Sequence, residues 1–263
     1  MPTFNDIAAV EAVAVGPIVA VGLHAAHRVR PEVAALLAVS EEDRLREEDP
    51  YTELWAAVGD VSVVARRSRF EVDLNRVRER AVYLGPEHAW GLDVWRRPPS
   101  PRRVAHSLAL YDAFYAGMRT LLDDVAARCG RFVVLDIHTY NHRRGGPDAP
   151  VDDPLANPEL NVGTVGVERN VWLPLLDRFV DVMRSSQVAG RPLDVRENVR
   201  FKGGCFMRWV NAAYPGVGCA LTLEWKKTFM DEWTGRCEPS HVSDIAEALA
   251  RVVPELRGAI RRM

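Results

Sequence analysis

The sequence predicts an α/β protein whose mixed, mostly parallel β-sheet is flanked by helices. Three stretches have the continuous apolar character of strands covered on both faces, namely 13–22, 132–137 and 217–224. Segments with helical spacing of apolar residues separate them, so strands and helices alternate along most of the chain. With 263 residues, of which 48% are hydrophobic, the chain can bury a sizeable core, and we expect residues 1–263 to form one domain.

The first half of the chain is predicted to contain two strands and two short helices. The strand at 13–22 is followed by a helix over 31–37, which a proline opens. Residues 41–50 form an acidic run, which we expect to be a solvated surface loop. A short helical pattern begins at Trp55, and residues 61–65 form the next predicted strand.

The stretch 68–76 alternates apolar and polar residues, which predicts a further strand. One face of that strand would carry Phe70, Val72 and Leu74. The opposite face would carry charged and amide side chains, namely Arg69, Glu71, Asp73 and Asn75. So much charge on one strand requires ion-pair partners or a cavity.

The second half is predicted to contain longer helices. Prolines at 98–101 predict a loop, and apolar residues at helical spacing then predict a helix over 102–127. Gly130 would close that helix. Residues 145–158 are rich in Gly, Pro and Asp and are expected to form a long loop near the site. The remaining predicted elements are a helix over 172–183, a turn at 201–204, and a last helix that Ser240 or Ser243 caps and that ends near Arg261.

Composition excludes several functional classes. The formal charge of −2 gives no electrostatic reason to expect a nucleic acid or a membrane surface as a partner. No apolar run approaches the roughly 20 residues that cross a bilayer. The first residues lack the pattern of a secretion signal, so a cytoplasmic protein is expected. The four cysteines are widely spaced, which indicates neither a disulfide framework nor a thiolate metal site.

The candidate site lies where the apolar strands end in ionisable residues. The central stretch runs into Asp136 and His138, the first strand into His24, and the third into Glu224. Open α/β sheets bind their ligands at the C-terminal ends of strands. A buried histidine alone is commonly a core residue. Two histidines with a carboxylate, however, are a common ligand set of catalytic zinc.

Several stretches, taken in order along the chain, resemble the N-formylglutamate amidohydrolase family. The most specific are Ser68–Arg76, with the sequence SRFEVDLNR, and Phe201–Gly204, with the sequence FKGG. The others are His24–Glu32, Glu48–Asp49, Asp136–Thr139, Asn161–Thr164, Arg208, Leu223–Glu224 and Thr228–Glu232. That family is similar to the zinc carboxypeptidases and aspartoacylase in fold and in the order of its functional residues. The resemblance therefore implies a zinc-carboxypeptidase-like mixed sheet with one catalytic Zn²⁺ ion.

The resemblance also implies the metal ligands. His24 and His138 would bind the zinc, and Asp49 would be the third ligand, because the acidic run keeps an aspartate where the family has one. Glu48 and His27 remain alternatives for that third position.

Catalytic and substrate-binding roles follow from the same resemblance. Glu224 would be the general base, and Arg69 would polarise the scissile carbonyl or bind a second carboxylate. Asn75 and Arg76 would hold a substrate carboxylate, which a guanidinium group matches with two parallel hydrogen bonds. Further substrate contacts are expected from Arg144 and Arg208.

The implied activity is the zinc-dependent hydrolysis of the amide bond of an N-acyl acidic amino acid such as N-formylglutamate. The partner would be such a small molecule, and the sequence leaves the oligomeric state open. The stretches 140–146 and 225–227 depart from the family pattern beside the site, so the acyl group and the leaving amine stay open. The alternatives are a carboxypeptidase-like hydrolase of short acidic peptides and a non-catalytic protein that binds anionic amino acids.

Overall fold

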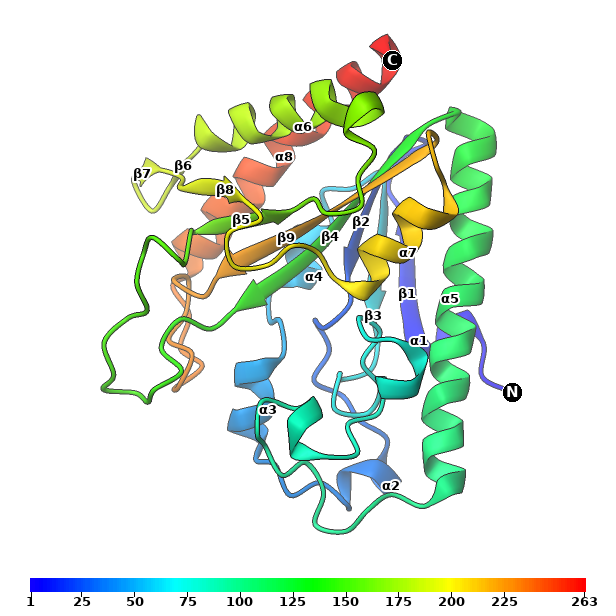
Figure 1. Cartoon of the computed structure of the whole chain (residues 1–263), viewed down its shortest axis with the longest axis vertical. Helices are drawn as coiled ribbons and strands as arrows, with labels where there is room; N and C mark the ends of the chain where they lie inside the picture. Colours follow the sequence, from blue (N-terminus) through cyan, green and yellow to red (C-terminus); the bar gives the residue numbers. More distant parts are fainter.

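The computed structural model describes all residues from Met1 to Met263 and contains a seven-stranded mixed sheet (Figure 1). The strand order is β1-β3-β2-β4-β9-β5-β8. These strands are β1 (Ala8–Ala12), β2 (Ile18–Gly22), β3 (Val61–Ala65), β4 (Phe132–Tyr140), β5 (Leu160–Gly163), β8 (Val195–Glu197) and β9 (Gly218–Lys226). A separate small hairpin consists of β6 (Gln187–Val188) and β7 (Arg191–Pro192).

Four neighbouring strands, β3, β2, β4 and β9, run parallel, whereas β1 pairs antiparallel with β3 and β5 antiparallel with β9. The predicted α/β class and mostly parallel mixed sheet are therefore confirmed. Parallel strands need crossover connections, and helices supply most of them here. The helices are α1 (Phe4–Ile7), α2 (Pro31–Ala34), α3 (Glu41–Glu47), α4 (Thr52–Ala56), α5 (Pro101–Cys129), α6 (Arg169–Arg184), α7 (Cys205–Ala213) and α8 (Pro239–Arg262).

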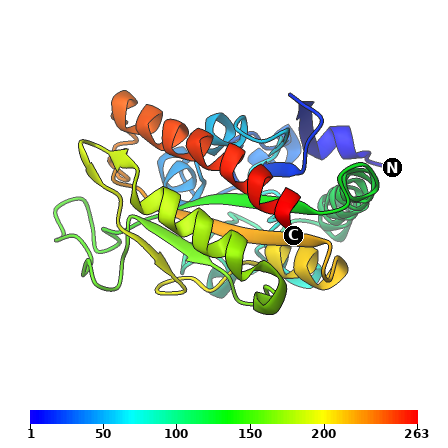
Figure 2. The same ribbon diagram turned by 90° about the horizontal axis from the view of Figure 1, so that it is seen from above.

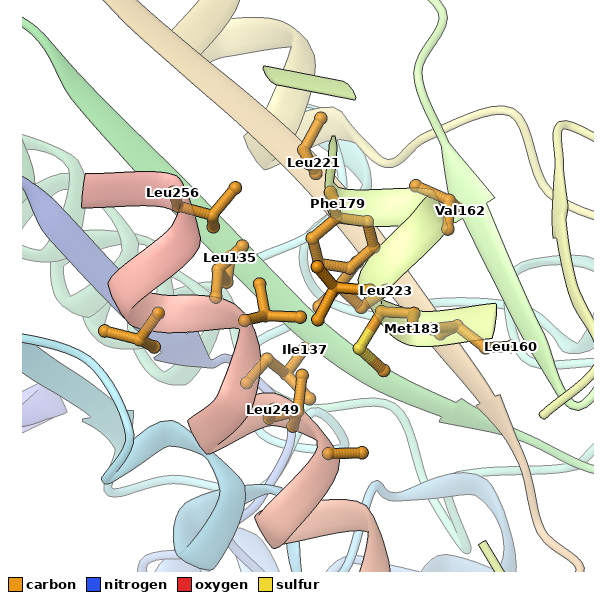
Figure 3. Packing of buried hydrophobic residues seen from close by; sticks show 14 of the residues in the cluster. Leu135, Ile137, Leu160, Val162, Phe179, Met183, Leu221, Leu223, Leu249 and Leu256 are labelled. Carbon is orange, nitrogen blue, oxygen red and sulfur yellow. The ribbon is translucent and has the colours of Figure 1, made fainter. Parts of the chain in front are cut away.

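Helices cover both faces of the sheet (Figures 1 and 2). One face packs against α6 and α8, and Leu135 and Ile137 of β4 point into that layer with Leu223 of β9 (Figure 3). The other face packs against α5 and α7, where Val134 of β4 and Ala220 of β9 are buried. This alternation follows from the two-residue period of a strand. It explains why the strand sequences are continuously apolar rather than alternating.

The acidic run at 41–50 was wrongly predicted as a solvated loop, because it contains α3. Ser40 caps this helix by accepting a hydrogen bond from the Asp43 backbone N–H at 3.0 Å. Acidic residues in the first turn also suit the positive end of the helix dipole. The helix leads inward, so that Glu48 and Asp49 are each only 1% exposed.

The stretch 68–76 was wrongly predicted as a strand, because it forms a series of turns. The Ser68 hydroxyl oxygen accepts a bond from the Phe70 backbone N–H, and the Asp73 carboxylate accepts one from the Asn75 N–H. Such short-range bonds compete with strand pairing. The apolar residues of this stretch are buried as expected, but Asp73 is buried as well.

Other boundaries differ more modestly from the sequence predictions. The strand predicted over 13–22 begins at Ile18, and the strands β1, β5 and β8 were not predicted. The last helix begins at Pro239, so Ser240 and Ser243 lie inside it instead of capping it. No helix in the structure combines the length and the apolar character that crossing a bilayer would require.

Candidate active site

The candidate site lies at the C-terminal ends of the parallel strands. It is on the same sheet face as α5 and α7, which cover the earlier residues of these strands. Asp136 and His138 follow Val134 at two-residue intervals on β4, and Glu224 follows Ala220 on β9 with the same parity. The parallel register pairs His138 with Glu224. The strands thus present both side chains on one face, past the point where the helices cover it.

Three buried side chains converge at this edge of the sheet. The Nδ1 atoms of His24 and His138 lie 3.1 and 2.8 Å from Oδ2 of Asp49. The ligand atoms of the three residues all lie within 4.8 Å of one another. Asp49 is held in place because its N–H donates to the His24 carbonyl at 2.9 Å, and the Thr139 hydroxyl donates to its Oδ1 at 3.1 Å. These residues form a group that could hold a metal ion.

Two further carboxylates orient the histidine rings. Nε2 of His24 lies 2.8 Å from Asp73, and Nε2 of His138 lies 2.9 Å from Asp136. Each ring therefore has a carboxylate at both nitrogens, and a carboxylate only accepts hydrogen bonds. A metal ion held by His24, Asp49 and His138 would replace the proton between each Nδ1 and Asp49, while each Nε2–H keeps its bond to Asp73 or Asp136. Two imidazole nitrogens and one carboxylate oxygen, oriented in this way and buried, fit a zinc ion with an open coordination position.

The charges of this cluster shift its pKa values strongly. Burial alone would raise the pKa of Asp49, but hydrogen bonds from His138 and His24 hold it well below its usual range. Burial would likewise raise the pKa of Asp73, and the charge of Arg69 holds it well below. Burial would lower the pKa of His138, and the charge and hydrogen bond of Asp136 hold it well above. Both aspartates are therefore ionised at neutral pH.

The other two residues considered as a third ligand have partners of their own. Nε2 of His27 lies 2.8 Å from an Arg44 nitrogen, which can only donate, so His27 carries its proton on Nδ1. That Nδ1 donates to Glu48 at 2.5 Å, and the Ser68 hydroxyl donates to the other Glu48 oxygen. Neither Glu48 nor His27 belongs to the group of ligand atoms that lie within 4.8 Å of one another, so the geometry favours Asp49.

A cavity of about 330 Å³ opens beside the three converging residues. Most of the residues predicted for the site line it: His24, Asp49, Arg69, Asn75, Arg76, His138, Arg144 and Glu224. Arg208 does not. It is exposed on α7, since Phe206, Met207 and Val210 form the buried side of that helix.

Glu224 enters the cavity without a partner from the protein. Its side chain makes neither an ion pair nor a hydrogen bond, and burial raises its pKa to about 7, against the opposing charge of His138. The neighbouring Lys226 does not pair with Glu224, because the Lys226 ammonium donates to the Asn157 carbonyl at 2.9 Å. A carboxylate with a pKa near neutrality is suited to proton transfer at physiological pH.

Arg69 is fixed by contacts on every side of its guanidinium. It donates to Asp73 at 2.9 Å, to the Glu47 carbonyl at 3.0 Å and to the Tyr83 hydroxyl at 3.0 Å. Its central carbon also lies 4.7 Å from the Trp90 ring centre. These contacts hold the positive charge in one place beside the cavity.

Asn75 presents its amide N–H groups to the site. Its Oδ1 accepts a bond from the Phe206 backbone N–H at 3.0 Å, so its Nδ2 must point the other way, to 3.2 Å from Nε2 of His138. That Nε2 already donates to Asp136 and cannot accept from Asn75. The Asn75 donors are thus free for a ligand. The adjacent Arg76 has only one distant partner, Asp73 at 3.6 Å.

Sequence reasoning missed several residues of the cavity. Lys227 is 1% exposed, and its ammonium donates to the carbonyls of Arg46 at 2.5 Å and Glu48 at 2.8 Å, on the segment that leads to Asp49. Burial lowers its pKa to about 8. The scarcity of lysine in the sequence was the only signal for it. Trp90 lines the cavity, and Tyr83 lies behind it, bonded to Arg69 and Asp73. Neither carried a signal in the sequence, because both come from an irregular segment.

Comparison with known proteins identifies a family and a fold. The sequence profile of a family described as N-formylglutamate amidohydrolase matches residues 16–229. No curated protein matches the sequence. The structure is similar to the crystal structure of N-formylglutamate amidohydrolase from Ralstonia eutropha JMP134, with a TM-score of 0.77, 15% identity, and 97% and 99% of the two chains covered. It is also similar to a gene product of Agrobacterium tumefaciens, with a TM-score of 0.68, 18% identity, and 97% and 96% covered. At these identities the structural matches establish the fold alone.

Proposed function

Because the chain belongs to the N-formylglutamate amidohydrolase family, we propose that it is a zinc-dependent hydrolase that cleaves the amide bond of N-acyl acidic amino acids such as N-formylglutamate. The family supports amide hydrolysis in general. The proposal adds two points to this general activity: that the reaction depends on zinc, and that the substrate is an N-acyl acidic amino acid. We also propose that residues 1–263 act as one catalytic domain, since the residues of the site lie at or beside one sheet.

One observation carries the proposal above all others. The unpaired Glu224 carboxylate lines the same cavity as His24, Asp49 and His138. A protein that only binds its ligand has no need of a free carboxylate whose pKa is raised to about 7 next to a potential metal site. A hydrolase needs such a group to remove a proton from the attacking water.

The residues have complementary roles in the proposed reaction. A zinc ion held by His24, Asp49 and His138 would act as a Lewis acid and lower the pKa of a water molecule towards about 7. Glu224 accepts the proton of the attacking water on its carboxylate and then delivers it to the nitrogen of the leaving amine. The fixed charge of Arg69 favours the negative charge that develops on the acyl oxygen.

Substrate binding is assigned to Asn75 and Arg76, whose donors have no strong acceptor in the protein. An amide N–H and a guanidinium on successive residues suit one carboxylate, and we propose that this is the α-carboxylate of the acidic amino acid. Arg144 is less available to the substrate, since it donates to both oxygens of Glu47, at 3.0 and 2.9 Å.

Replacing Arg76 with Ala tests this assignment. We expect kcat/KM for N-formyl-L-glutamate to fall, because a charged bidentate partner is lost. The corresponding loss of transition-state binding free energy should be about 2–4 kcal/mol. The α-carboxamide of the same substrate should lose much less. Arg208→Ala is the matched control, since this exposed arginine lies outside the cavity and should leave both rates unchanged. Equal losses on the acid and the amide would show that Arg76 has a structural role instead.

The experiment for the proposed function is a substrate screen with the zinc-loaded protein. N-formyl and N-acetyl derivatives of glutamate and aspartate are compared with short acidic peptides, and release of the free amine is measured. Hydrolysis of the N-acyl amino acids supports the proposal. Preferential cleavage of peptides would favour the carboxypeptidase-like alternative. Binding of acidic amino acids without turnover would favour the non-catalytic one.

A further inference from the structure

The cavity has a strong excess of positive charge. Seven lysine and arginine side chains line it, against the three carboxylates Glu47, Asp49 and Glu224. The excess would grow further with a bound metal cation. A cavity with excess positive charge attracts anions. A ligand with two negative charges would neutralise more of this excess than a ligand with one.

Most of these cations already have partners in the protein. Arg46 pairs with Asp43 at 2.6 Å, and Arg200 pairs with Asp152 at 3.3 Å. The others that are held by protein contacts are Arg69, Arg144 and Lys227, as described above. A cation that is fixed by such contacts contributes to the field in the cavity but has fewer donors to offer a ligand.

Two of the seven cations have no such partner. Arg76 has only the contact to Asp73 at 3.6 Å, which is longer than a hydrogen bond. The Lys202 ammonium makes no hydrogen bond or ion pair at all, although its backbone is held, because the Lys202 carbonyl accepts a bond from the Val165 N–H at 3.0 Å. Lys202 is therefore a free cation on a fixed backbone.

The two glycines after Lys202 determine how its backbone lies against the site. Gly203 has a φ of 123°, which residues with a side chain rarely adopt. A Cβ atom on Gly204 would lie 2.3 Å from the Asn75 amide, so only glycine allows this close approach. The turn thus packs directly against the residue beside Arg76 and brings Lys202 to the same cavity.

We propose that Lys202 determines specificity by binding the side-chain carboxylate of the substrate, while Asn75 and Arg76 bind the α-carboxylate. The two cations without strong protein partners match the two carboxylates of an N-acyl glutamate or aspartate. The site therefore selects a dianionic substrate over a singly charged N-acyl amino acid. This inference rests on the proposed function. Arg144 and Arg208 are less suited to this role, because Arg144 is paired with Glu47 and Arg208 lies outside the cavity.

The test compares N-formyl-L-glutamate with N-formyl-L-glutamine, which has a neutral amide in place of the side-chain carboxylate. In the zinc-loaded wild type, kcat/KM should favour the glutamate derivative. Lys202→Met should lower that preference about tenfold, mainly through the loss of rate with the glutamate derivative, because one charged contact disappears. Lys202→Arg keeps the charge and should retain most of the preference.

Lys226→Met is the matched control, since Lys226 is a nearby lysine whose ammonium binds the Asn157 carbonyl and which does not line the cavity. It should leave the preference unchanged. An unchanged preference in Lys202→Met, or an equal loss in Lys226→Met, would overturn the proposal. If the wild type hydrolyses none of the N-acyl amino acids in the substrate screen above, the proposed function fails. Calorimetric binding of the two compounds to wild type and Lys202→Met then still decides whether Lys202 recognises the second carboxylate.

Discussion

Replacing Glu224 with Gln is expected to lower the turnover rate by about 10²–10⁴ while zinc content and substrate affinity stay near those of the wild type. Glutamine has nearly the shape of glutamate and still forms hydrogen bonds, but it cannot accept the proton of the attacking water. General base catalysis contributes a factor of this size. Because the same group also protonates the leaving amine, the loss should lie toward the upper end of the range.

The pH profile gives an independent check on Glu224. Burial raises the pKa of this carboxyl group to about 7, and only the ionised form can act as a base. The wild-type kcat/KM should therefore fall as pH decreases through this pKa. A nearby zinc ion favours the ionised form, so the midpoint should lie at or below about 7. The Gln variant should lack this acidic limb.

Each other outcome for Glu224→Gln has a clear meaning. Near-normal turnover would mean that Glu224 is not the general base. Loss of zinc would make Glu224 a ligand and would contradict the assignment of Asp49. An acidic limb that is unchanged in the variant would assign it to the water on the metal.

Replacing His138 with Ala is expected to remove most of the zinc and, with it, the activity. Its Nδ1 is one of three converging ligand atoms, and its ring is fixed by Asp136. Loss of a residue that only orients a ligand costs about 10- to 100-fold in metal affinity, so loss of the ligand itself should cost more. His24→Ala should behave in the same way, and metal analysis after dialysis measures both.

His27→Ala is the control for these two variants. His27 lies three residues after His24, but its ring is bonded to Arg44 and Glu48 and does not line the cavity. This variant should keep a full equivalent of zinc. A His138→Ala protein that retained the full equivalent would refute the proposed metal centre.

The sequence identified those parts of the site that lie on buried strands. His24, His138 and Glu224 each follow an apolar run, and parallel strands bring their C-terminal ends to the same edge. The sequence did not give the order of the strands in the sheet, which places β2, β4 and β9 side by side and so makes these three residues neighbours. The family resemblance added Asp49, which the structure places against both histidines.

The residues that orient the site could not be predicted from local patterns. Asp73 contacts His24 across 49 positions of sequence, and Tyr83 and Arg69 contact Asp73 from a segment without regular structure. Such contacts depend on how irregular segments fold over the sheet, for which there is no periodic signal. The same limit explains why 68–76 was taken for a strand, because its alternation of apolar residues is compatible with turns that bury both sides.

The most direct test of the central claim is a titration of the metal-free protein with zinc, following hydrolysis of N-formyl-L-glutamate. We predict that the metal-free protein is inactive and that activity rises linearly and saturates at one equivalent of zinc. In Glu224→Gln the same equivalent should bind without restoring activity. Hydrolysis by the metal-free protein, or a wild type that binds one equivalent of zinc and still turns over no N-acyl amino acid, would contradict this account.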